Sequence, residues 1–206
     1  MTKAARPHRA PAAALRSAAL LCCALSLPLA GCSGIPYSES AADGPYGSAL
    51  KHATRRAALI DTLETRAFVR LVHVSPELAA MQAERLSALR GEGPAESAAR
   101  RERARADASA PTFLAVVFTP HPEWNDWGAK GSSWRIALDA AGGQVEPASV
   151  QRFERPFPVE LTWNYPFIDD FHVAYRLQFP AGTPSQAAHL TVAGVLGKLE
   201  FDWKDE

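Results

Sequence analysis

The six-residue run FLAVVF, Phe113–Phe118, constrains the fold more than any other stretch of the chain. Every side chain in this run is apolar, so the run has no polar face to turn towards water. Such a stretch is typical of a central strand that is buried on both faces. The chain therefore needs apolar side chains on each side of this strand.

The aromatic residues are concentrated in the same part of the chain. Only Tyr37, Tyr46 and Phe68 precede Pro111, and all five tryptophans follow it. Aromatic side chains bury large apolar areas, so we expect the main core to form from residues 111–206.

Several other short stretches are β-branched and aromatic, or alternate apolar with polar residues as half-buried strands do. They are Ala67–Val74, Trp134–Asp139, Val145–Phe153, Val173–Phe179, Leu190–Val192 and Leu199–Trp203. The glycines of Gly194–Gly197 make the last two stretches a hairpin. Five or six short strands with Gly- and Pro-rich turns predict a mainly β fold, an antiparallel β-sandwich.

One helix is predicted over residues 76–90. Ser75 is a suitable N-cap and Pro76 suits the first helical position, where its missing N–H costs nothing. Gly91 can end the helix in the left-handed conformation. We expect the helix to lie on a sheet through one apolar face, formed by Leu78, Met81, Leu86 and Leu89.

Two other segments leave more than one interpretation open. Residues 49–66 fit either a short helix or the start of a strand. Residues 92–110 are rich in Arg, Glu and Ala, and are either a solvated helix or a disordered loop, with Glu96 and Arg100 as a possible helix pair. A patch that attracts anionic lipid or polymer is the functional alternative for this charged segment.

The N-terminus has the layout of a secretory leader. Residues 1–16 are basic, and Ser17–Ala30 is an apolar run too short to span a bilayer as a permanent helix. The run closes with Leu29-Ala30-Gly31-Cys32, which resembles the lipobox of bacterial lipoproteins. The resemblance implies that residues 1–31 are removed as a signal peptide and that Cys32 receives a diacylglycerol.

An ordinary cleaved signal peptide and an uncleaved anchor are the competing interpretations of the leader. In the lipoprotein family, Ser33 after the cysteine implies the outer membrane of a bacterial cell envelope. Because Cys22 and Cys23 would leave with the leader, we expect neither a disulfide nor a cysteine-based zinc site in the mature domain.

The strand order and the closing strand Leu199–Trp203 also resemble uncharacterised secreted lipoproteins with an immunoglobulin-like β-sandwich. The resemblance implies that fold and brings no functional residues. We therefore expect a signal peptide over 1–31, a flexible tether over 32–48 and a single domain over 49–206. That domain would be an immunoglobulin-like sandwich with the helix at 76–90 and the charged segment 92–110 inserted.

Charge excludes one class of partner. Four of the 22 basic residues, and none of the 22 acidic residues, lie in residues 1–31, so the rest of the chain carries 18 basic and 22 acidic residues. A nucleic-acid-binding protein needs a basic face to neutralise phosphates. We therefore expect no nucleic-acid partner.

Two clusters carry residues that could perform chemistry. A loop cluster contains His121, Glu123 and Asp126, and Asp169-Asp170 with His172 precede the clearest alternating strand. The first could hold a metal, and the second could hold Ca²⁺ or form an acid–base pair, but ordinary loop and turn residues are the favoured explanation of both. No nucleophile elbow or phosphate-binding loop occurs. We predict no cofactor, no metal and no enzymatic activity.

The pair Trp124 and Trp127 marks the most interesting loop. Asn125 and Asp126 lie between the tryptophans, and flat aromatic faces beside hydrogen-bonding side chains can hold sugars or partner loops. The alternative is that one or both rings plug an end of the sandwich.

The expected function is a lipid-anchored cell-envelope protein with a non-catalytic binding or structural role. Its partners would be the membrane, through Cys32, and an envelope protein or surface glycan. A glycan-binding module that uses Trp124 and Trp127 is the second hypothesis, and a metal-dependent hydrolase is the third.

Overall fold

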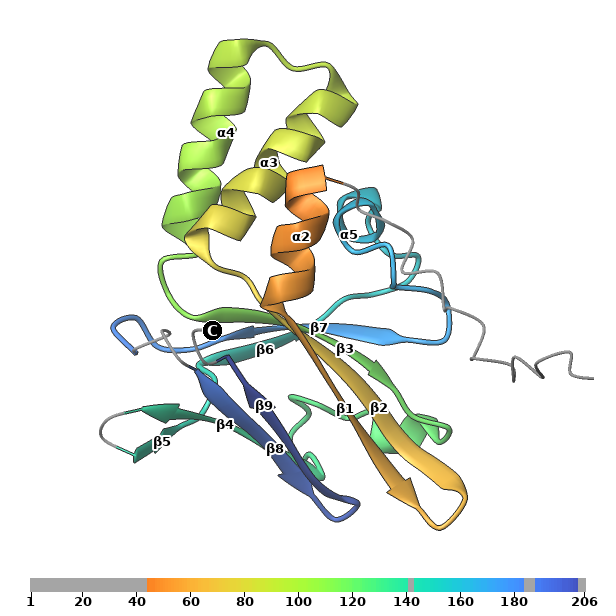
Figure 1. The fold of residues 1–206 in the computed structure, drawn as a ribbon. Coiled ribbons are helices and arrows are strands. Elements are labelled where there is room, and N and C mark those ends of the chain that lie inside the picture. Colours follow the sequence, from red (N-terminus) through yellow and green to blue (C-terminus); the bar gives the residue numbers. More distant parts are fainter. Residues whose placement is uncertain (1–43, 141–142, 184–187, 204–206) are drawn as a thin grey trace, which may run out of the picture. The chain divides into compact units, whose positions relative to one another are not determined.

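The computed structural model describes residues 44–140, 143–183 and 188–203. Within these residues the chain forms three layers: a layer of helices, a five-stranded sheet and a four-stranded sheet (Figure 1). The predicted signal peptide, Cys32 and residues 32–43 of the predicted tether lie outside the described residues.

Both sheets are antiparallel throughout. The five-stranded sheet has the order β1 (Thr54–Asp61), β2 (Glu64–His73), β3 (Thr112–Phe118), β7 (Val173–Gln178), β6 (Ser149–Arg152). The four-stranded sheet has the order β5 (Gly143–Val145), β4 (Trp134–Ala140), β8 (His189–Gly194), β9 (Gly197–Asp202). The helices are α2 (Gly44–Ala53), α3 (Pro76–Arg90), α4 (Pro94–Asp107) and α5 (Val159–Asn164), with a 3₁₀ turn at Pro122–Trp124.

The central strand β3 is covered on both faces, as its sequence requires. Phe113, Ala115 and Val117 belong to the core between the two sheets. Leu114 and Val116 belong to a second core, between the five-stranded sheet and the helices. Since successive side chains of a strand point to opposite faces, one apolar run supplies both cores.

The prediction of a mainly β, antiparallel fold is confirmed, and the expectation of a single helix is wrong. Residues 49–66, which fitted either helix or strand, contain both: α2 ends at Ala53 and β1 begins at the next residue. The predicted tether is also too long. Helix α2 starts at Gly44, and its Tyr46 and Leu50 are buried.

The predicted β8–β9 hairpin is confirmed, with Leu190 opposite Phe201. Gly197 closes its turn at a φ of 140°, and a Cβ there would approach Leu59 of β1 to 3.0 Å. The single strand predicted over Val145–Phe153 is wrong. Val145 ends β5 in the four-stranded sheet, and the chain then crosses to the five-stranded sheet, where Ser149–Arg152 forms β6.

Helix α3 has the predicted bounds and caps. The Leu78 amide donates to Ser75 Oγ over 3.2 Å, and Gly91 is left-handed with a φ of 65°. The predicted apolar face is only partly correct. Leu78 is buried, but Leu89 is 45% exposed, because the end of α3 extends beyond the sheet and packs against α4 instead (Figure 1).

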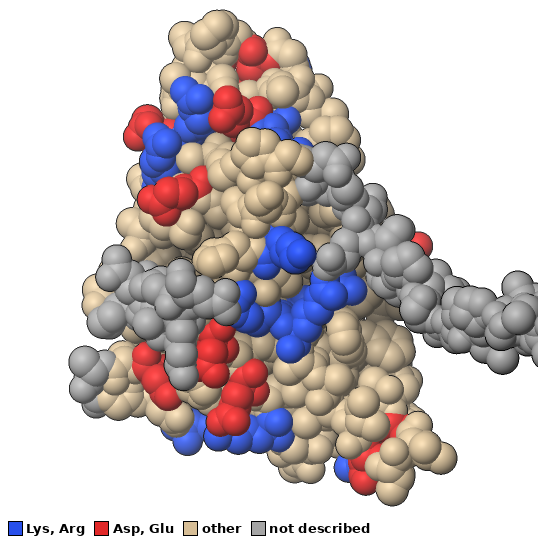
Figure 2. Space-filling view, viewed as in Figure 1, with Lys and Arg blue, Asp and Glu red and all other residues tan. Residues whose placement is uncertain are grey.

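The charged segment 92–110 is a helix rather than a disordered loop, and α4 buries none of its residues. Figure 2 shows acidic and basic side chains interleaved over α3 and α4. The predicted pair of Glu96 with Arg100 forms no salt bridge among the described residues, although the Glu96 carboxylate helps to raise the pKa of Arg100 after the larger effect of its hydrogen bond to Glu92. Arg100 instead binds Glu92 between the two helices, with its Nε donating to Glu92 Oε2 over 2.8 Å. The Glu96 side chain accepts from the amide of Gly93, the N-cap residue.

A search of the described residues for a membrane-spanning segment finds no helix that is both long and apolar enough.

His73 closes one end of the core between the sheets. Its ring stacks on Phe113 at 5.0 Å and meets Trp203 edge-on at 6.1 Å. Burial lowers the pKa of His73 below its ordinary value, and the Glu77 carboxylate opposes that shift. The unfolded chain therefore takes up a proton at this residue at a higher pH than the folded chain does.

We predict that this difference costs stability as the pH falls through about 6.5, the ordinary pKa of histidine. The melting temperature of wild type should drop more between pH 7.5 and pH 5.5 than that of the variant His73→Phe, which keeps an aromatic ring and cannot titrate. Parallel pH profiles of the two proteins would contradict this role of His73.

Candidate functional site

The loop that carries the tryptophan pair crosses from β3 to β4, and so joins the two sheets. Trp127 is only 4% exposed and belongs to the core between the sheets. Its ring stacks on Tyr175 at 5.6 Å and lies 6.1 Å from the ring of Trp134. Trp127 is therefore a core residue, as the alternative interpretation of the tryptophan pair proposed.

The polar residues of the loop bind the protein itself. The Tyr175 hydroxyl donates to the main-chain oxygen of the buried Asn125 over 2.8 Å and lies 2.9 Å from its Oδ1. Asp126 accepts from the amide of Ser133 over 2.8 Å. Trp124 is half-buried, with its ring 4.3 Å from that of His121. Of the four predicted binding residues, Trp124 alone presents a partly exposed aromatic face.

The two predicted chemical clusters are also arranged as turns. His121 lies 3.6 Å from Glu123 and 3.7 Å from Glu64, whereas Asp126 binds within its own loop. His172 is buried, and its Nδ1 lies 2.6 Å from Asp169 Oδ1. Across the described residues, no three His, Cys, Asp or Glu side chains are placed to hold a metal ion.

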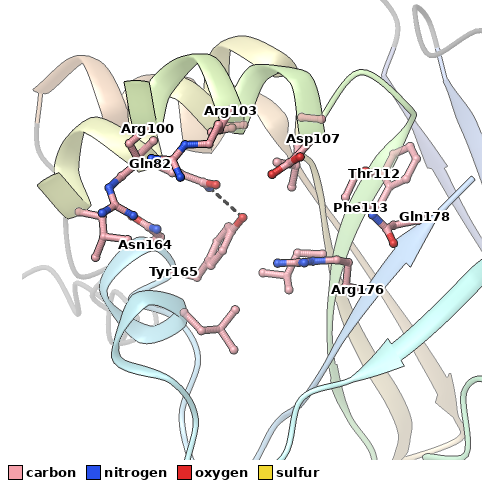
Figure 3. Close-up of a pocket in the computed structure, with 18 of the residues that line it drawn as sticks. Gln82, Arg100, Arg103, Asp107, Thr112, Phe113, Asn164, Tyr165, Arg176 and Gln178 are labelled. Carbon is pink, nitrogen blue, oxygen red and sulfur yellow. Dashed lines mark hydrogen bonds between the residues drawn. The ribbon is translucent and has the colours of Figure 1, made fainter. Parts of the chain in front are cut away.

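The best candidate site is instead a cavity of about 420 Å³ under the helical layer (Figure 3). Helices α3, α4 and α5 surround it, and β3 and β7 of the five-stranded sheet line it from below. Its apolar lining includes Leu86, Leu114, Phe153 and Leu161. The volume falls within the range of about 300–1,000 Å³ that is typical of small-molecule sites.

A buried hydrogen-bond network forms one wall of this cavity. Gln82 Nε2 donates to the hydroxyl of Tyr165 over 2.8 Å (Figure 3), and the Tyr46 hydroxyl donates to the Asn164 main-chain oxygen over 2.5 Å. Burial raises the pKa of Tyr165 and raises that of Tyr46 to about 12. Both hydroxyls are protonated at neutral pH, as tyrosine ordinarily is, and burial moves their ionisation still further from neutral pH.

Three arginines and the carboxylate of Asp107 give the cavity its charge. Arg100 is neutralised by Glu92, and its hydrogen bonds lower the pKa of the Glu92 carboxyl. Among the described residues, Arg103 of α4 and Arg176 of β7 form no salt bridge with a carboxylate. The Arg176 guanidinium lies 5.5 Å from the ring centre of Phe153.

Sequence reasoning missed this cavity for an identifiable reason. Arg176 is the polar residue of an alternating strand, and alternation alone predicts that it faces water. Arg176 is indeed exposed, but helices on that face of the five-stranded sheet place it in the lining of an open cavity. The available signal was the expectation that α3 lies on a sheet, since residues of the strands beneath it would then lie beside a helix.

The chain matches no family model, no curated protein and no solved structure.

The two tryptophans of the loop are expected to differ sharply in their contribution to stability. Trp127→Ala should lower the free energy of unfolding by about 3–5 kcal/mol, as the loss of a fully buried aromatic ring does. Trp124→Ala should cost less than about 2 kcal/mol, since the group that accepts from Trp134 Nε1 is the main-chain oxygen of Trp124. Urea denaturation measures both values, and equal losses would contradict this assignment.

Proposed function

We propose that this protein is a lipid-anchored component of a bacterial cell envelope with a binding rather than a catalytic role. The lipobox Leu29-Ala30-Gly31-Cys32 supports the anchor, and Ser33 favours the outer membrane. An immunoglobulin-like relationship for the two sheets is part of the same proposal and rests on the resemblance of the strand pattern.

The cavity between the helices and the five-stranded sheet carries the binding role. It combines an apolar lining with a few polar groups that come from different elements, the composition typical of sites for small molecules. The ligand would be a small molecule rather than a polymer, because the cavity volume of about 420 Å³ suits a molecule of that size.

The titratable groups at the cavity suit binding better than proton transfer. Arg103 and Arg176 supply positive charge, and the Tyr165 hydroxyl is neutral, as tyrosine ordinarily is at neutral pH, with burial raising its pKa further. A general acid or base works best when its pKa lies near the operating pH. Fixed positive charge and neutral hydroxyls instead hold a ligand without changing it.

The anchor predicts a result for Cys32→Ala. This variant should lose incorporation of labelled fatty acid and accumulate at the size of the unprocessed precursor, because the modified thiol is absent. Cys23→Ala removes a neighbouring cysteine and should label and mature like wild type. Undiminished labelling of Cys32→Ala would contradict the anchor.

The binding role predicts a result for two alanines of α4. Ala104 lines the cavity, and Ala106 is exposed on the same helix. A small-molecule extract of the envelope should raise the melting temperature of wild type and of Ala106→Phe, but not that of Ala104→Phe, whose ring occupies the cavity. If the extract left wild type unchanged, the proposed binding role would be wrong.

A further inference from the structure

We infer that the cavity binds a small amphipathic anion, a molecule with a carboxylate or phosphate head and an apolar body. This inference rests on the proposed binding role and adds the chemistry of the ligand. Two features of the lining carry it: two arginines without a carboxylate partner, and apolar side chains that come from both the helices and the sheet side.

The anionic head follows from Arg103 and Arg176. They come from opposite sides of the cavity, helix α4 and strand β7, and neither forms a salt bridge with a described carboxylate. With Arg100 neutralised by Glu92, these two cations face the single negative charge of Asp107. The balance is positive, and the guanidinium fork matches the oxygens of a carboxylate or phosphate.

The apolar body follows from the rest of the lining. Leu86, Leu114, Phe153 and Leu161 come from both the helical layer and the sheet side. A ligand that placed only a charged head here would leave this apolar surface in contact with water. An alkyl or aryl group would cover it, at about 25 cal/mol for each Å² removed from water.

A sugar or another polyhydroxylated ligand fits less well, because most neutral polar side chains of the lining already have partners. Among the described lining residues, the Oδ1 of Asn164 is the buried polar atom without a partner, and it offers a ligand one hydrogen bond rather than several. Gln82 donates to Tyr165 over 2.8 Å. The Thr112 hydroxyl donates to the Ala110 main-chain oxygen over 3.0 Å, and Gln178 accepts from a serine. Breaking these bonds to satisfy several ligand hydroxyls would cost as much as it gained.

The test uses the full-length anchored protein in lipid nanodiscs and four probes with the same ten-carbon chain. These are decanoate, decyl phosphate, decanol and decyltrimethylammonium, and calorimetry measures each dissociation constant against empty nanodiscs. Decanoate or decyl phosphate, or both, should bind at least about tenfold more tightly than decanol and decyltrimethylammonium. The two anions distinguish a carboxylate head from a phosphate head.

Matched variants locate the anion. Arg176→Gln and Arg103→Gln should each weaken binding of the preferred anion about tenfold, as expected for the loss of a charge-assisted hydrogen bond. Arg105→Gln changes the net charge equally, but Arg105 pairs with Glu102 outside the cavity lining, and its binding should stay within about twofold of wild type. Ala104→Phe should abolish binding, and melting curves verify that every variant is folded.

Several outcomes would overturn the inference. If decanol bound as tightly as the anions, the charged head would not contribute to recognition. If inorganic phosphate bound as tightly as decyl phosphate, the apolar body would not contribute. Equal weakening by Arg105→Gln would place the anion elsewhere. If no probe binds while the envelope extract still stabilises wild type and not Ala104→Phe, the ligand class is wrong and the binding role stands. If the extract also has no effect, the binding role itself fails.

Discussion

The burial of β3 on both faces is the constraint on which the rest of the structure depends. Phe113–Phe118 offers water no polar side, so the five-stranded sheet needs a layer on each face. The four-stranded sheet covers one face with aromatic side chains. The helices cover the other face, where Leu114 and Val116 lie. Their placement above these two residues also determines where a cavity can form.

Helices α3 and α4 meet through small and polar residues, and this explains why the helical layer leaves space. Helix α3 turns small buried residues, including Ala79, Ala83 and Ser87, towards its neighbours, and α4 buries none of its own. Ser87 and Arg100 both bind Glu92, which fixes the helical hairpin without filling the volume beneath it. Alanines and arginines position the helices, but they do not close the gap above Arg176.

Local sequence patterns predicted local structure well. They failed where the outcome depends on contacts between elements that are distant in the sequence. The bounds of α3 follow from Ser75 and Gly91 because capping depends on neighbouring residues alone. The exposure of Leu89 depends on how far the sheet extends beneath the helix, which no pattern within the helix contains. The core position of Trp127 and the cavity position of Arg176 likewise depend on which elements meet in three dimensions. The sequence left both tryptophans open as core or surface. It predicted the exposure of Arg176 but not the helices that lie beside it.

The division into two cores separates the helical side of the cavity from the core between the sheets. The core between the sheets contains the largest buried aromatic side chains and includes no residue of α3 or α4. Segments with few buried apolar contacts open at a lower free energy than the whole domain unfolds. Helix α4 buries none of its residues and is tied to α3 by the bonds of Arg100 to Glu92 and of Arg101 to Glu84. The α4 side of the cavity therefore depends on polar contacts between two helices, whereas the two sheets depend on the apolar core between them.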